Sequence, residues 1–215
     1  IRSASHIAFF RKYGRKGHAR SIVEGLLPKD TIEFAMEYPV TTEISLSDPR
    51  YNEILSKFYE NCATHVRNLS DQGQNVYVLC EGDPFFYGSF MHIYSRLHPE
   101  WPIEVIPAIT GMSGAWTATG IPVTWGSNVL TVLMGTLPEA ELADRLANTD
   151  AAIVMKIGRN LEKIRRAVGV TGRLEQAYIV EYATMPDQSV FPLANYAPEE
   201  APYFSIIVLH GKPDR

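Results

Sequence analysis

One short stretch of the chain, Glu81-Gly82-Asp83-Pro84, combines acidic side chains with two residues that shape the backbone. It follows a predicted strand and precedes a predicted helix, which is where open α/β sheets bind ligands. Gly82 lets the backbone approach a ligand closely, Asp83 offers a carboxylate, and Phe86 belongs to an aromatic run that supplies an apolar wall. A purely structural interpretation stays open, in which Asp83 caps the helix and Pro84 occupies its first position.

Two further stretches have residue types that suit a ligand. The small residues at positions 110–114 follow another predicted strand and permit close backbone approach, although close packing of a helix on a sheet explains them equally well. A basic run near the start suits a carboxylate or phosphate, with a solvated loop as the alternative. Its members of interest are Arg15, Lys16, His18 and Arg20.

Several reaction classes are disfavoured by motifs that the sequence lacks. It contains no GxGxxG, GxxxxGK[ST], HExxH or GxSxG motif, so dinucleotide, P-loop, zincin and α/β-hydrolase chemistry are not indicated. The 6 histidines are scattered, and the 2 cysteines, Cys62 and Cys80, form no CxxC pair. Neither a metal site nor a disulfide framework is expected, and this cysteine usage favours a reducing cytoplasm.

The overall composition indicates a globular protein. With 215 residues, of which 46% are hydrophobic and 20% charged, the chain is long enough for one large domain or two small ones. A net charge of −4 disfavours binding to nucleic acid through phosphate neutralisation alone. No apolar run approaches the ~20 residues of a membrane helix, and the first residues lack a signal-peptide core.

Short strand-like runs alternate with helix-length periodic segments, a pattern typical of an α/β protein. Strands are predicted at residues 7–10, 31–40, 75–80, 103–106, 129–134, 151–157, 177–181 and 204–209. Helices are predicted at residues 19–27, 48–72, 86–97, 138–146 and 161–168, and a further small-residue helix is entered from residues 107–115. In the longest of these helices, Asp48 is the expected cap, Pro49 the first helical residue and Gly73 the end.

Glycine and proline interrupt the chain without periodicity at residues 120–126, which predicts a domain boundary near residue 122. The predicted organisation is an N-terminal α/β domain over residues 1–122 and a C-terminal α/β domain over residues 123–215. No internal repeat or coiled-coil heptad contradicts this division.

Residues 81–90, EGDPFFYGSF, closely resemble a segment of the tetrapyrrole (corrin and porphyrin) methyltransferases of cobalamin biosynthesis. Residues 107–110, 133–135, 180–184 and 203–208 resemble further segments of that family, although Ala108 and Ala183 stand where it usually has glycine. Within the family, the first run together with residues 183–188 is similar to the branch that methylates C-20 of precorrin-2 or of its cobalt-containing counterpart, cobalt-factor II.

The resemblance implies a homodimeric, S-adenosylmethionine-dependent C-methyltransferase of two α/β domains, with the cofactor in the cleft between them and no protein-bound metal. The cofactor contacts that it implies, position by position, are Glu81, Gly82, Asp83, Phe86, Thr110, Gly111, Met134, Ala183, Tyr203, Phe204 and Ser205. The implied substrate is fringed by acetates and propionates, so the basic loop with Arg15, Lys16, His18 and Arg20 is expected to pair with them.

The family also opens with a strand and a Gly-Pro-Gly-Asp loop that have no counterpart here, so the N-terminal domain is expected to lack its first strand, loop and helix. Spacing does not select the base that removes the proton from the methylated carbon. Glu81, Glu181, Tyr87 and His18 all remain candidates. The alternatives are another corrin-ring methylase, a ribosomal RNA ribose methylase or diphthine synthase of the same superfamily, and a non-catalytic anion- or nucleotide-binding module.

Overall fold

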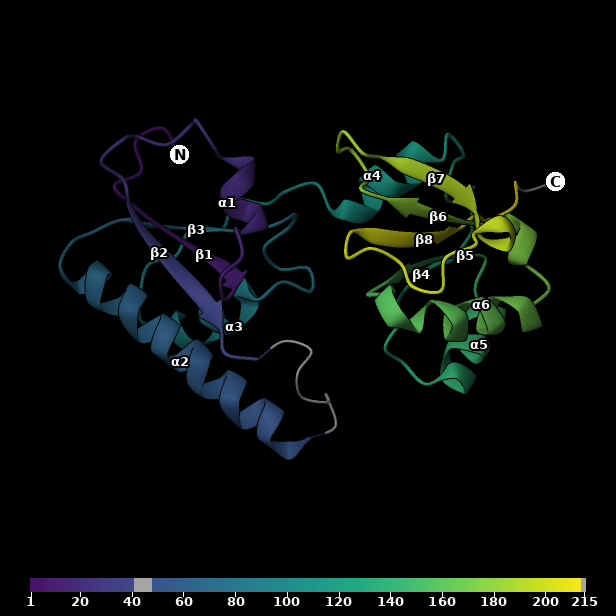
Figure 1. The fold of residues 1–215 in the computed structure, drawn as a ribbon, viewed down its shortest axis with the longest axis horizontal. Coiled ribbons are helices and arrows are strands. Elements are labelled where there is room, and N and C mark those ends of the chain that lie inside the picture. The colour runs from purple at the N-terminus through teal and green to yellow at the C-terminus, as the bar shows by residue number, and fades with distance from the viewer. Residues whose placement is uncertain (41–47, 214–215) are drawn as a thin grey trace. The chain divides into compact units, whose positions relative to one another are not determined.

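The computed structural model describes residues 1–40 and 48–213, and the chain divides into two compact units, residues 1–108 and 109–215 (Figure 1). Each unit combines a β-sheet with helices around its own hydrophobic core, which confirms the α/β prediction. The division lies earlier in the chain than the expected boundary near residue 122. The reason is that helix α4 (Gly111–Ala118) buries Ala115 against the sheet of the second unit.

The first unit contains a parallel sheet of three strands in the order β2-β1-β3. Its elements are β1 (His6–Lys12), α1 (His18–Ile22), β2 (Ile32–Tyr38), α2 (Pro49–Asp71), β3 (Val76–Leu79) and α3 (Phe90–Leu97). Successive side chains of a strand point to opposite faces, so Ala8 contributes to the core under α2 and α3, whereas Ile7 and Phe9 contribute to the other face. Tyr59 of α2 and Ile93 of α3 complete the first core.

The long helix α2 begins and ends where the sequence predicts. The Asp48 carboxylate accepts a hydrogen bond from the Arg50 amide at 2.9 Å, and Pro49 occupies the first turn. After the helix, Gly73 adopts a φ of 77°, a left-handed conformation that glycine takes without steric cost. The prediction of this helix from its end signals is therefore confirmed.

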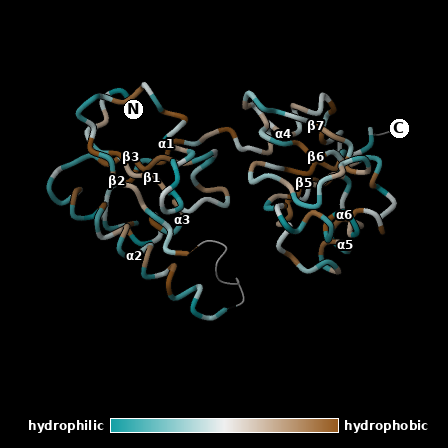
Figure 2. Tube along the Cα trace, viewed as in Figure 1, coloured by the Kyte–Doolittle hydropathy of each residue, from teal (hydrophilic) through white to brown (hydrophobic). Residues whose placement is uncertain are grey.

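The second unit contains a mixed sheet of five strands in the order β4-β5-β8-β6-β7. Its elements after α4 are β4 (Leu130–Met134), α5 (Glu139–Ala147), β5 (Ala151–Met155), α6 (Leu161–Val170), β6 (Ala177–Glu181), β7 (Ser189–Pro192) and β8 (Ser205–Leu209), with 3₁₀ turns at Gly158–Asn160, Leu174–Gln176 and Leu193–Asn195. Helix α4 covers one face of the sheet, and α5 and α6 cover the other. Along β8, Ile206 and Val208 face α4, whereas Ile207 and Leu209 face α5 and α6. Figure 2 shows hydrophobic residues concentrated in these strands.

The structure differs from the predicted elements at four places. The helix predicted at residues 19–27 ends at Ile22, because turns follow it. Residues 103–106 form no strand; Ile103 and Val105 pack against the core of the first unit while Ile106 stays 70% exposed, so their alternation reflects side-chain packing without a strand partner. Helix α3 begins at Phe90 rather than at residue 86, because turns occupy the preceding residues. The short strand β7, which ends at Pro192, was not predicted.

Gly135, directly after β4, gives a test of packing in the second unit. A Cβ added at this position would lie 2.7 Å from Ile164 Cδ1, 2.9 Å from the Lys156 carbonyl oxygen and 3.1 Å from that of Met155. We expect Gly135→Ala to lower the free energy of unfolding by about 1 to 3 kcal/mol, because backbone atoms have to move. Urea denaturation followed by circular dichroism measures the change.

The matched control is Gly169→Ala in α6, where an added Cβ would meet no atom within 4 Å. This variant should leave stability unchanged or raise it by up to about 1 kcal/mol, because alanine favours the helix more than glycine does. If Gly135→Ala proved as stable as the control, the close packing at the end of β4 would be refuted.

Candidate functional site

In the first unit, the predicted site residues gather at one edge of the sheet. Strands β1 and β3 are hydrogen-bonded in parallel, so the loops that follow them leave from the same edge. The first loop leads into α1, and the second carries Glu81. The Glu81 carboxyl lies beside the Ala19 amide and within the electrostatic field of His18, and both lower its pKa. The structure therefore brings the basic loop and the acidic loop together.

The pKa of the Glu81 carboxyl is raised although the side chain remains partly accessible to solvent. Burial raises the pKa of the Glu81 carboxyl, and the field of His18 and the Ala19 amide oppose that shift without cancelling it. The neighbouring Cys80 is affected in the same way: burial, with the negative charges of Glu81 and Asp83, raises the pKa of its thiol to about 11. Cys80 is therefore a protonated thiol at neutral pH and is not a nucleophile of this site.

Asp83 acts within the loop in a way that neither sequence interpretation anticipated. One oxygen of its carboxylate accepts a hydrogen bond from the Phe85 amide at 2.9 Å, and the other accepts one from the Ala108 amide at 3.1 Å. It does not cap a helix, because α3 begins only at Phe90. Asp83 thus fixes the loop after β3 to residue 108, while Gly82, at a φ of 77°, exposes the backbone beside it.

The aromatic part of this loop holds a strained residue. Tyr87 has a φ of 53°, which costs a residue other than glycine free energy of order 1 kcal/mol or more. Its ring is 46% exposed and packs edge-on against Phe86, with ring centroids 4.8 Å apart. Strain of this kind persists where the surrounding structure requires it, and it is common at ligand-binding sites.

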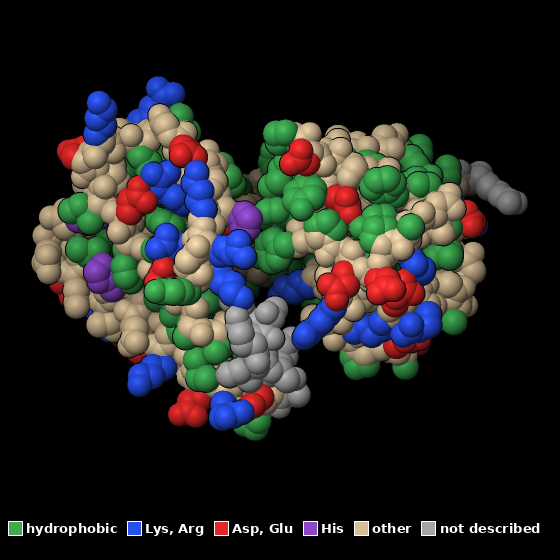
Figure 3. Space-filling view, in the orientation of Figure 1, with side chains coloured by type: hydrophobic (Ala, Val, Ile, Leu, Met, Phe, Trp, Pro, Cys, Tyr) green, Lys and Arg blue, Asp and Glu red, His purple; other side chains and the backbone are tan. Residues whose placement is uncertain are grey.

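The basic residues of the first unit differ in whether they form ion pairs with glutamate side chains. Lys16 pairs with Glu24 at 2.6 Å, and Arg20 pairs with Glu33 at 2.7 Å through several hydrogen bonds. Figure 3 shows acidic side chains interspersed among the basic ones on this unit. Among the described residues, Arg15 forms no ion pair and is exposed. Arg15 is therefore the member of the predicted set with a charge left for an external anion.

In the second unit, the predicted residues also lie at one edge of the sheet. The register places the end of β4, the end of β6 and the start of β8 at that edge, which brings Met134, Ala183 and Ser205 to it. Helix α4 starts there too, because a Cβ on Gly111 would lie 3.7 Å from Ile206 Cδ1. The Thr110 hydroxyl, at the helix start, lies 3.2 Å from the Ser113 hydroxyl.

The small residues of α4 have two different surroundings. A Cβ on Gly114 would lie 2.9 Å from Thr184 Cγ2 and 3.6 Å from Ala183 Cβ, so this glycine serves close packing. Gly111, by contrast, is exposed and leaves its backbone accessible. The packing interpretation thus holds for Gly114, whereas the backbone in the first turn of α4 is open to a ligand.

The segment Tyr203–Ser205 presents two kinds of surface at this edge. Tyr203 is 79% exposed, and its ring meets that of Phe204 with centroids 5.0 Å apart. Ser205 is buried, and among the described residues its hydroxyl has no hydrogen-bond partner. Because side chains alternate along β8, Ser205 points to the face opposite Ile206, so its side chain does not lie on the α4 face.

Glu181, one of the four candidate bases, is already engaged within the second unit. Its carboxylate accepts a hydrogen bond from the Ser189 hydroxyl at 3.0 Å and another from the Tyr196 hydroxyl. Burial, together with the Glu181 carboxylate, raises the pKa of Tyr196, so the phenol remains the donor. With both oxygens occupied, Glu181 holds the end of β6 in place and is a poor acceptor for a proton from a ligand.

Several non-glycine residues near the two sheet edges have a strained backbone, which their residue types did not predict. Besides Tyr87, the described non-glycine residues with positive φ are Lys156 at 55°, Tyr182 at 48° and Thr184 at 66°. Each of them follows the end of a strand at one of the two candidate edges. None is a glycine, so the sequence carried no signal for their conformation. Such clustering favours functional loops at both edges.

Asp83→Ala tests the role of the carboxylate in the loop after β3. We expect a loss of about 1 to 3 kcal/mol in the free energy of unfolding, because the amides of Phe85 and Ala108 both lose a charged acceptor. Asp30→Ala, at an exposed position, is the control and should change stability by less than about 0.5 kcal/mol. Equal stability of the two variants in urea denaturation would contradict the assignment.

The described residues contain no group of three or more His, Cys, Asp or Glu side chains arranged to hold a metal ion. In the same part of the chain, no helix has both the length and the apolar character needed to cross a membrane.

Comparison with known proteins relates both units to one family. The family model of the tetrapyrrole (corrin/porphyrin) methylases matches residues 1–196. The precorrin-2 C(20)-methyltransferase of Sinorhizobium sp. is 50% identical over 212 residues, 99% of this chain and 86% of that protein. The cobalt-precorrin-2 C(20)-methyltransferase of Salmonella typhimurium is 25% identical over 203 residues, 92% of this chain and 82% of that protein. The crystal structure of a cobalt precorrin-4 methyltransferase aligns with a TM-score of 0.69 at 15% identity, covering 97% of this chain and 84% of that one. These matches include residues of both units, and the chain belongs to the tetrapyrrole (corrin/porphyrin) methylases.

Proposed function

We propose that this protein transfers a methyl group from S-adenosylmethionine to C-20 of precorrin-2 in cobalamin biosynthesis. The observation that carries the proposal is the 50% identity, over 99% of the chain, with the Sinorhizobium precorrin-2 C(20)-methyltransferase. The two edges described above support it, because both combine accessible backbone with strained loops. Methylation of the cobalt-containing ring, or at another ring carbon, is the alternative.

The residues at the two edges suit S-adenosylmethionine. Gly82 and Gly111 leave backbone amides and carbonyls accessible, and Tyr203 offers an exposed aromatic face. The proposed cofactor contacts are Glu81, Gly82, Asp83, Phe86, Thr110, Gly111, Met134, Ala183, Tyr203, Phe204 and Ser205. Asp83 acts through the loop that it fixes, since both of its oxygens accept backbone hydrogen bonds.

S-adenosylmethionine supplies an electrophilic methyl group, so the protein does not need a nucleophile of its own. The contribution of this chain is to orient the two reactants, which in favourable cases lowers a barrier by roughly 7 to 11 kcal/mol, and to exclude water. The methylated ring carbon must also lose a proton. Of the four candidate bases, Glu81 has a raised pKa and an accessible carboxylate, whereas Glu181 is occupied by Ser189 and Tyr196.

Incubation with labelled S-adenosylmethionine and either metal-free precorrin-2 or cobalt-factor II tests the reaction. We expect the methyl group at C-20 and faster transfer to the metal-free ring. The reason is that the precorrin-2 C(20)-methyltransferase is 50% identical to this chain, whereas the cobalt-precorrin-2 C(20)-methyltransferase is 25% identical. Carbon-13 NMR of the product assigns the methylated position.

Faster transfer to cobalt-factor II would replace the proposed substrate with its cobalt-containing counterpart. A methyl group at another carbon would indicate another corrin-ring methylase. If S-adenosylhomocysteine did not bind in calorimetry, the enzyme proposal as a whole would fail.

The substrate carries several carboxylates, and we propose that the basic loop of the first unit recognises them. Arg15 is the principal residue, because Lys16 and Arg20 are already paired with Glu24 and Glu33. His18 lies beside Glu81, so it joins this loop to the proposed cofactor contacts. An arginine suits a carboxylate because its guanidinium donates two parallel hydrogen bonds.

Arg15→Ala should raise KM for precorrin-2 about three- to tenfold and change kcat little, because it removes a contact that does not involve the reacting carbon. The control is Lys29→Ala, an exposed lysine that precedes β2 and so lies at the opposite edge of the parallel sheet. Steady-state kinetics of both variants measure KM for precorrin-2 and kcat, and the control should change neither. An unchanged KM in Arg15→Ala would remove Arg15 from the substrate site.

Two further features of the proposal concern the protein as a whole. We infer a homodimer from the family resemblance, and sedimentation equilibrium of the purified protein tests it. We also infer a cytoplasmic location, which the two free cysteines, Cys62 and Cys80, support because a reducing compartment keeps thiols free.

A further inference from the structure

The loop that follows β5 carries two exposed cations. Lys156 comes directly after the strand, and Arg159 lies in the 3₁₀ turn Gly158–Asn160. Because β4 and β5 are parallel, this loop leaves the sheet at the edge where β4 ends, and the last residue of β4, Met134, is a proposed cofactor contact. The two cations therefore lie at the edge of the second unit that holds the candidate site.

Backbone hydrogen bonds hold this loop between two segments of the candidate site. The amide of Gly135, directly after β4, donates to the Met155 carbonyl oxygen at 2.7 Å. From the other direction, the Ala201 amide donates to the Gly158 carbonyl oxygen at 3.2 Å, two residues before the exposed Tyr203. The loop is thus fixed next to the end of β4 and next to the segment that leads into β8.

Lys156 has a backbone conformation that costs free energy. Its φ is 55°, which residues other than glycine adopt at a cost of order 1 kcal/mol or more. The next residue, Ile157, is 2% exposed and packs in the core under α5 and α6, so the loop is anchored from below. Strain that the surrounding structure maintains is common in ligand-binding loops, and it favours a binding role for this one.

Arg159 differs from the other described arginines of the second unit in its surroundings. Arg145, Arg165 and Arg166 each form an ion pair with a glutamate at 2.7 Å, and Arg173 donates to backbone carbonyl oxygens. Among the described residues, Arg159 has neither an ion pair nor a hydrogen bond to its guanidinium. Its charge and its N–H donors are therefore available to an external ligand.

The chemistry of the loop favours a ligand with net negative charge. A guanidinium donates two parallel hydrogen bonds to a carboxylate, and a lysine in the same loop adds a second positive charge. S-adenosylmethionine suits such a pair poorly, because its carboxylate stands beside an ammonium group. The proposed substrate suits it well, since its ring carries several carboxylates. The net charge of −4 on the whole chain repels that ring, so local cations have to attract it.

We propose that Arg159, with Lys156 in the same loop, binds a carboxylate of the tetrapyrrole substrate and so helps to select it. This inference rests on the proposed function, because it names residues that recognise the substrate of that reaction. Arg159 supplies the paired N–H donors, and Lys156 strengthens the positive field around them. The loop acts in binding and takes no part in methyl transfer or in the loss of the proton.

The test is a titration of precorrin-2 into the full chain saturated with S-adenosylhomocysteine, which has no methyl group to transfer. Ring absorption follows binding, so Kd is measured without turnover. We expect Arg159→Ala to raise Kd for precorrin-2 about three- to tenfold, and Lys156→Ala to raise it about two- to threefold. Arg159→Lys should recover part of the loss, because it keeps the charge without the fork of donors.

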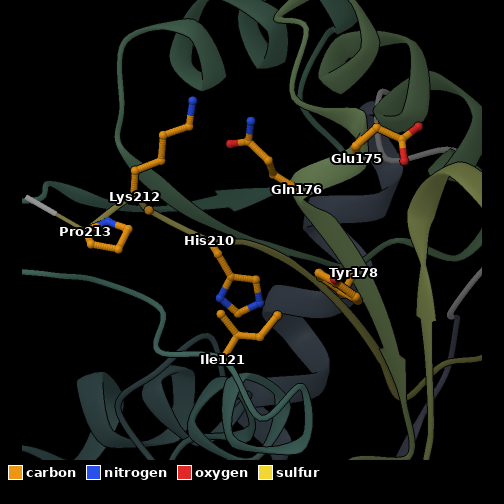
Figure 4. Close-up of a pocket in the computed structure, with 8 residues that line it drawn as sticks. Ile121, Glu175, Gln176, Tyr178, His210, Lys212 and Pro213 are labelled. Carbon is orange, nitrogen blue, oxygen red and sulfur yellow. The ribbon is translucent and has the colours of Figure 1, made fainter. Parts of the chain in front are cut away.

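The matched control is Lys212→Ala. Lys212 is also an exposed cation of the second unit, but it follows β8 at the opposite edge of the sheet, where it lines the pocket shown in Figure 4. Its removal should leave Kd for precorrin-2 unchanged. Calorimetry with S-adenosylhomocysteine checks the folding of every variant, and Kd for this ligand should stay within about twofold of the wild-type value.

An unchanged Kd for precorrin-2 in Arg159→Ala would overturn the inference. So would a rise in Kd for S-adenosylhomocysteine that matched the rise for precorrin-2, because the loop would then bind the carboxylate of the cofactor. Failure of the proposed function gives a different result. A wild-type protein that bound precorrin-2 without methylating C-20 would refute the reaction alone, and Kd of Arg159→Ala would still decide the binding role. A wild-type protein that did not bind precorrin-2 would overturn both.

Discussion

In the first unit, β1, β2 and β3 are hydrogen-bonded in parallel, and this pairing forces the loops after them to one edge of the sheet. In this way the Ala19 amide and the Glu81 carboxyl, more than 60 residues apart in sequence, become neighbours. The second unit reaches the same result with a mixed sheet, because β8 starts where β4 and β6 end. Strand direction thus decides which residues can meet one ligand in each unit, and the remaining features of the candidate site depend on it.

The loops at these edges are held by polar contacts within the chain, which leaves few charges for a ligand. Asp83 uses both oxygens on backbone amides, and Glu181 uses both on hydroxyl groups. The same loops hold Tyr87 and Tyr182 in strained conformations, which persist only where the surrounding structure requires them. This arrangement suits methyl transfer, because the cofactor carries the reactive group and the protein mainly has to position it.

The two ends of the second sheet have different chemical characters. At one end, accessible backbone and aromatic rings dominate, whereas at the other His210 Nε2 and the Gln176 side-chain oxygen are buried without a hydrogen-bond partner among the described residues. Antiparallel pairing of β6 with β8 produces both ends, since it aligns Glu181 with Ser205 and Ala177 with Leu209.

The sequence by itself determined the α/β class, most helices and strands, and the family. Local signals sufficed there, such as the cap and proline that start α2 and the run EGDPFFYGSF. Tertiary structure decided what such signals do not encode. Residues 103–106 alternate like a strand but have no strand partner, and the unit boundary follows the packing of α4. Lys16 and Arg20 form ion pairs with Glu24 and Glu33, 8 and 13 residues further along the chain. In each case the outcome depends on which residues become neighbours in space, and residue order along the chain does not specify that.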